Sequence, residues 1–151
     1  MSEIIRIKDQ LERAFKGDAW HGPSVLNALR DVTAERANGK PLKGAHSIWE
    51  IVLHIAAWHQ AVTQRLEGYV VSLTREEDWP PIEDYDESTW RSTLELLNES
   101  YNNLLKKVSS LSESDLDKTA PGRNHTIYVM LHGIIQHDLY HAGQIAILKK
   151  G

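Results

Sequence analysis

The chain of 151 residues contains no cysteine. This absence excludes a disulfide framework, a thiolate metal site and a cysteine nucleophile, so any thiol in its chemistry must come from a substrate. The sequence also lacks an apolar run long enough to span a bilayer, and its first residues, Met1-Ser2-Glu3, do not begin a signal peptide. We therefore expect a cytoplasmic protein with no membrane partner.

Positive charge is not in excess either. The formal net charge is -4 and the pI is about 6.0. A nucleic-acid surface usually needs a basic face, so this balance favours a small-molecule partner over a nucleic acid. Alternating strand patterns, internal repeats and low-complexity tracts are absent as well. The length suits a single domain over residues 1–151, which is long enough to bury its own core.

What the sequence does contain is apolar residues spaced three and four apart, the period of an amphipathic helix. Four long segments show it: residues 3–16, 47–68, 88–109 and 126–150. The second segment begins with Ser47 and Glu50 in the spacing of a capping box, in which each side chain accepts from the backbone N–H of the other residue. These segments predict an all-α fold, a four-helix bundle.

The connections between these segments differ in length. Residues 23–34 predict a short extra helix, and residues 35–46 predict a loop. Residues 69–87 show no helical period, and Trp79-Pro80-Pro81 is incompatible with regular helix. Antiparallel neighbours in a bundle usually need only about two to eight linking residues. This long connection therefore allows the second and third long helices to run parallel, and such loops are often functional lids.

Eight histidines are many for this length, and two of them stand out. His137 and His141 lie four residues apart in the last predicted helix, so they share one face at the edge of its apolar arc. Two imidazoles placed in this way can bind one metal ion, which needs further ligands from elsewhere. His132 projects roughly 140° away from His137 and is expected at the surface.

The third ligand could come from His54 or His59, which flank the apolar arc of the second long helix on opposite sides. Periodicity does not choose between them, although His54 has the more central position. A single histidine at such a flank is more often a hydrogen-bonded structural residue. His46 and His125 are expected in a loop and at an exposed helix start, and the tryptophans mostly in packing.

Two segments of the chain resemble the DinB/YfiT-like family of metal-dependent enzymes. They are Ser47-Ile48-Trp49-Glu50-Ile51-Val52-Leu53-His54 and His137-Asp138-Leu139-Tyr140-His141-Ala142-Gly143-Gln144-Ile145. The loop Asp18-Ala19-Trp20-His21-Gly22-Pro23-Ser24 is also similar to members of this group, so the resemblance covers essentially the whole chain. It implies a metal site formed by His54, His137 and His141, and it selects His54 over His59.

The resemblance also implies a four-helix bundle in up-down-down-up order, a divalent metal ion (most often zinc or nickel) and a homodimer. Family members with known activity include S-transferases that use low-molecular-weight thiols and a thiol-dependent isomerase, whereas many members have no assigned activity. The first hypothesis is therefore a metal-dependent thiol S-transferase. The alternatives are a metal-dependent hydrolase and a non-catalytic, stress-related metal-binding protein.

Three polar residues are candidates for orienting the imidazoles through their second ring nitrogens. They are Glu50, Asp138 and Gln144. For Glu50 the capping role is favoured. No residue is predicted to act directly in catalysis.

Overall fold

Helices make up the regular structure of the chain, and the computed structural model describes all residues from Met1 to Gly151. The four long helices are α1 (Glu3–Phe15), α4 (Ile48–Leu66), α6 (Glu87–Ser109) and α7 (Ile127–Leu148). The connections contain four short elements: α2 (Val25–Leu29), α3 (Ala34–Asn38), α5 (Arg75–Asp78) and the 3-10 helix η1 (Glu113–Asp117). No helix is both long and apolar enough to cross a membrane.

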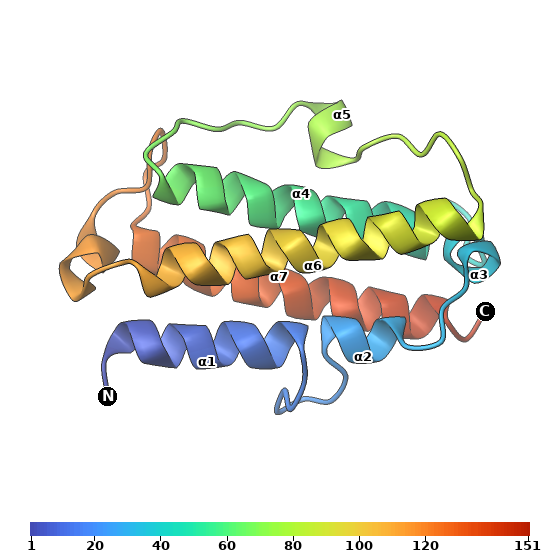
Figure 1. Cartoon of the computed structure of the whole chain (residues 1–151), viewed down its shortest axis with the longest axis horizontal. Coiled ribbons are helices and arrows are strands. Elements are labelled where there is room, and N and C mark those ends of the chain that lie inside the picture. The colour runs from blue at the N-terminus through green and yellow to red at the C-terminus, as the bar shows by residue number, and fades with distance from the viewer.

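The long helices form a four-helix bundle in the predicted order. In Figure 1, α1 and α7 run in one direction while α4 and α6 run in the other. Each of α1 and α4 packs against both α6 and α7, which closes the ring. The parallel pair α4 and α6 is possible because residues 67–86, which include α5, return along the outside of the bundle. The up-down-down-up arrangement is thus confirmed.

The short elements differ in part from the prediction. The helix expected over residues 23–34 ends at Leu29, because Arg30 leaves the helical conformation with ψ 132° and Asp31 follows it with a left-handed φ of 63°. Residues 35–38, expected at the start of a loop, belong to α3 (Ala34–Asn38). The helical turn α5 begins at Thr74, whose side chain forms a capping box with Glu77.

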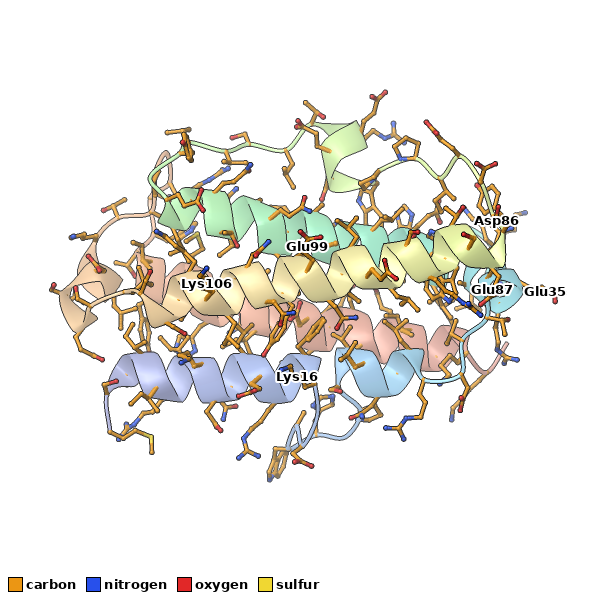
Figure 2. All side chains as sticks on the ribbon, viewed as in Figure 1. Lys16, Glu35, Asp86, Glu87, Glu99 and Lys106 are labelled. Atoms are coloured by element: carbon orange, nitrogen blue, oxygen red, sulfur yellow. The ribbon has the colours of Figure 1, made fainter.

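Side-chain caps fix where the long helices begin. Ser47 Oγ accepts from the Glu50 N–H at 3.1 Å, and the Glu50 carboxylate accepts from the Ser47 N–H at 2.6 Å, as predicted. Asp86 caps α6, and the neighbouring Glu87 lies beside α3, where it accepts from the Ala34 N–H at 2.9 Å (Figure 2). Asp86 thus stabilises the start of α6 itself, whereas Glu87 connects the start of α6 to the start of α3.

The core lies between the four long helices. Its largest fully buried side chains include Trp49, Trp90 and Tyr101. The Trp49 indole N–H donates to Thr93 Oγ1 at 3.1 Å, which joins α4 to α6. Charged side chains such as Glu99 and Lys106 project outward from α6 (Figure 2). Packing was the expected role of the tryptophans, but Trp20 is fully exposed in the loop after α1.

We expect Ser47→Ala to lower the free energy of unfolding by about 1 kcal/mol, because α4 loses its N-terminal cap. Urea denaturation measures this change. Ser92→Ala is the matched control, since Ser92 is exposed and its hydroxyl bonds only to Ser88 O in its own helix. The control should change stability by less than about 0.5 kcal/mol. Equal effects of the two substitutions would contradict a capping contribution at Ser47.

Candidate metal centre

Three imidazoles from α4 and α7 converge on one point. The Nε2 atom of His137 lies 3.0 Å from Nε2 of His54 and 3.2 Å from Nε2 of His141. The ligand atoms of all three residues lie within 4.8 Å of one another. The structure thus brings together the three histidines singled out in the sequence, and the group could hold a metal ion.

Helix geometry explains the convergence. His137 and His141 are one turn apart on α7, so their rings lie side by side on the face that meets α4. His54 comes from the middle of α4, which packs directly against α7. His54 and His141 are buried and His137 is half-buried. The site therefore lies at the edge of the core, as the apolar arc of α7 predicted.

His54 and His141 each make a hydrogen bond through Nδ1, which leaves the lone pair of Nε2 free. His54 Nδ1 lies 2.8 Å from Asp78 O and 3.0 Å from Asp78 Oδ1, and both oxygens accept. His141 Nδ1 lies 2.7 Å from Gln144 Oε1. We therefore assign the ring protons of His54 and His141 to Nδ1. Two lone pairs then face the third ring, which is the tautomeric arrangement that metal binding requires.

The donor set and its spacing fit a divalent cation. Imidazole nitrogens that share a tetrahedral zinc ion at about 2.0–2.1 Å stand about 3.3 Å apart, close to two of the separations seen here. His137 Nδ1 is buried without a hydrogen-bond partner. At most one of the three converging Nε2 atoms therefore carries a proton. The others present lone pairs, which a cation would satisfy.

Burial keeps the site uncharged. Burial first, and then the nearby His141 and His54, lower the pKa of His137 to about 3. Burial also lowers the pKa of His54, although Asp78 opposes the shift. The pKa of His141 is lowered for the same reason, against the effect of Gln144. At neutral pH all three rings are thus in the neutral form that binds metal.

The long connection contributes residues that the sequence analysis did not assign to the site. The Trp79 ring stacks on His54 with centroids 3.9 Å apart, and on its other face it stacks on His46 at 3.6 Å. Asp78 accepts from the Trp58 indole N–H at 2.7 Å as well as from His54. The α5 turn therefore fixes the orientation of His54. The Thr74-x-x-Glu77 spacing predicts such a turn but not where it docks.

The three candidates for orienting the imidazoles have different partners. Gln144 bonds to His141, as expected. Glu50 caps α4, the role favoured for it. Asp138 is fully buried and bonds to Nε2 of His59 at 2.8 Å instead of to one of the three converging rings. His59, the alternative to His54, thus lies in the core, where its Nδ1 is 3.3 Å from Ser100 Oγ.

Two other histidines are less exposed than the sequence suggested. His132, expected at the surface, is half-buried beside Tyr128, and its Nε2 is buried without a partner. His125, expected to be exposed, is half-buried as well. Apolar periodicity misses both: His132 packs against Tyr128 one turn earlier in its own helix, and His125 lies just before Thr126, the cap of α7.

Two cavities adjoin each other at His141, one of the three converging histidines. The first, which we call the Arg65 cavity, has a volume of about 560 Å³ and includes His54, His137 and His141 in its lining. Its apolar walls are Val62, Val129, Met130 and Ile134. The second, the Trp79 cavity, has a volume of about 370 Å³ and is lined largely by apolar side chains. Tyr140 and His141 line both cavities, whereas His54 and His137 line only the first.

This architecture defines a class: an all-helical bundle with a possible three-histidine metal site between adjacent helices. The chain matches the family model of the DinB superfamily over residues 19–145, and it belongs to that superfamily. No curated protein and no solved structure matches the chain.

We expect protein purified without a polyhistidine tag or chelator to contain near-stoichiometric divalent metal, and His137→Ala to lose it. The reason is that His137 Nε2 lies between the other two ligand atoms. Inductively coupled plasma mass spectrometry measures the metal content. His132→Ala removes a histidine from the same helix outside the site and should keep the metal. Unchanged metal content in His137→Ala would refute the proposed ligand set.

In the chelated protein, we expect stability to fall as the pH drops below about 6.5, the ordinary pKa of histidine. The unfolded chain then binds protons that the folded site excludes, because the folded pKa values are lowered. The loss should grow as the pH falls toward about 3, the pKa of His137. Thermal unfolding between about pH 7.5 and 5 measures it. His137→Gln should reduce this dependence, and an unchanged slope would contradict the assignment.

Proposed function

We propose that the chain is a metal-dependent S-transferase that activates a low-molecular-weight thiol at His54, His137 and His141. The observation that best supports this proposal is that all three histidines line one cavity and that His141 also lines a second. A transfer reaction needs two substrates at one point, and separate cavities could hold the thiol and its electrophilic acceptor on either side. The absence of cysteine supports an external thiol, because no side chain of the chain competes with it.

Each residue of the site has a defined part in this proposal. Three neutral imidazoles preserve the full charge of a divalent ion and leave at least one ligand position open. Zinc or nickel held there would lower the pKa of a thiol and stabilise the thiolate. Asp78 O and Gln144 Oε1 keep two of the rings in the correct orientation. Trp79 covers His54 and shields it from water.

The chemistry also needs a place for the thiol proton. In the transfer step, a bond forms between the thiolate sulfur and an electrophilic carbon while the bond from that carbon to its leaving group breaks. Asp78 is the one carboxylate in the lining of the Arg65 cavity, and only its Oδ1 accepts from Trp58 and His54. We assign Asp78 Oδ2 as the atom that receives the proton, since it makes no hydrogen bond and belongs to a half-buried carboxylate that contacts His54 through Oδ1.

A metal-dependent hydrolase is the second candidate, and Asp78 is the observation that favours it. The same carboxylate could accept a proton from water, and hydrolysis would need only one of the two cavities. A non-catalytic metal-binding protein is the third. Both catalytic candidates, the S-transferase and the hydrolase, act on a small-molecule substrate. The homodimer stays a prediction.

We expect the cobalt-substituted protein to develop a thiolate charge-transfer band when 2-mercaptoethanol is added, because the thiol would ionise at an open ligand position. Near-ultraviolet absorption spectroscopy measures the band. Ethylene glycol, which replaces the thiol by a hydroxyl, is the matched control and should produce no band. A metal-loaded protein that does not respond to the thiol would refute the S-transferase proposal and favour the hydrolase or the non-catalytic alternative.

A further inference from the structure

A buried arginine lines the same cavity as the three histidines. Arg65 is only 5% exposed and lies eleven residues after His54 on α4, about 16 Å farther along the helix axis. Trp58 lies between the two regions, with its ring centre 5.4 Å from Arg65 Cζ and 5.8 Å from the ring centre of His137. The Arg65 cavity therefore connects a cationic side chain to the proposed metal ligands.

The charge of Arg65 has no counter-ion in the chain. Its Nε and Nη2 atoms donate to Val71 O at 3.2 and 2.9 Å, and Nη1 makes no hydrogen bond. No carboxylate lies within ion-pair distance of the guanidinium. Nη1 keeps contact with solvent, so the charge is largely but not fully removed from water. Burial of most of a charged group without a paired carboxylate is destabilising. The carbonyl and the Trp58 ring offset only part of that cost.

A second guanidinium increases the local positive charge. Arg123 Nη2 donates to the same Val71 O and, at 3.1 Å, to Ser72 Oγ, while its Nε is buried without a partner. Arg123 has no carboxylate partner either. Burial, and then the like charge of Arg123, lower the pKa of Arg65. A single neutral donor would be enough to hydrogen-bond the Val71 carbonyl. Anchoring this carbonyl therefore does not explain why two charged guanidinium groups lie beside it.

We propose that the Arg65 cavity binds a substrate with an oxyanion group, a carboxylate or a phosphate ester, which pairs with Arg65. The apolar part of this substrate lies against Val62, Met130 and Ile134, and its reactive end points toward the histidines. A planar guanidinium binds either oxyanion through parallel N–H···O bonds, and Nη1 is free for one of them. Only the direction of the reactive end rests on the proposed function, since the anion site needs no metal.

Isothermal titration calorimetry with three probes of similar size tests this assignment. The probes are 4-phenylbutyrate, 3-phenylpropyl phosphate and the neutral 4-phenylbutanol. At least one anion should bind about tenfold to a hundredfold more tightly than the alcohol, as a hydrogen-bonded charge contributes. The tighter of the two anions identifies the oxyanion. The preference should persist after chelation, because a carboxylate that only coordinates a metal ion would lose it.

Two sets of variants locate the anion. Arg65→Met keeps an apolar stem and should abolish the preference for the anion, with circular dichroism as the test of folding. Val129 lines the cavity, yet it is 52% exposed, so its replacement does not depend on core packing. Val129→Glu should weaken binding of the anion through repulsion and competition for Arg65. Val129→Gln, which introduces a side chain of the same shape without the charge, should not. If Arg65→Met does not fold, this second pair decides.

Several outcomes would overturn the inference without touching the proposed thiol chemistry. They are equal affinity for anion and alcohol, no binding of either anion, an unchanged preference in Arg65→Met, and equal effects of Val129→Glu and Val129→Gln. Loss of the preference on chelation would equally assign the anion to the metal ion and not to Arg65. None of these results depends on turnover, so they differ from a failure of the S-transferase proposal.

Discussion

The buried bond between His59 and Asp138 fixes α4 against α7, and the candidate site depends on that registration. Both side chains are fully buried, and the His59 Nε2–Asp138 Oδ1 distance is 2.8 Å. Sliding one helix along the other would leave a buried charged or polar group without its partner, which costs more than the bond contributes when made. Asp138 directly follows His137, and His59 lies little more than one turn after His54. The same bond that aligns the helices therefore aligns their ligand atoms.

The parallel course of α4 and α6 connects topology to chemistry. A chain that leaves the end of α4 and enters α6 in the same direction must return along the whole bundle, and residues 67–86 do so. That return passes the histidines and supplies Asp78 and Trp79, which hold and cover His54. A short hairpin between antiparallel helices could not place them there. The long connection is thus a structural requirement of the fold that also completes the site.

Local signals predicted the parts of the fold that depend on neighbours in sequence. Apolar periodicity located the long helices, the Ser47–Glu50 spacing predicted the start of α4, and the i, i+4 spacing predicted that His137 and His141 share a face. The choice between His54 and His59 was beyond periodicity, because both flank the apolar arc and both turned out to be buried. Resemblance to a family was needed to select His54. Asp78 and Trp79 contact His54 from more than 20 residues away in the chain, and the cavity that Arg65 lines is completed by residues of α7, so no local pattern could reveal these arrangements.

The charges around the Arg65 cavity constrain what it can accept. The chain as a whole has a net charge of -4, yet Arg65 is buried in this cavity without a counter-ion. The three histidines are neutral because burial lowers their pKa values, so they contribute metal-ligand atoms without adding charge. A cationic ligand would add repulsion to the desolvation of Arg65, and a neutral one would leave that cost uncompensated. An anionic ligand is the one class whose binding would supply the counter-ion that Arg65 lacks, while the Asp78 carboxylate lies beside His54 at the histidine end of the cavity.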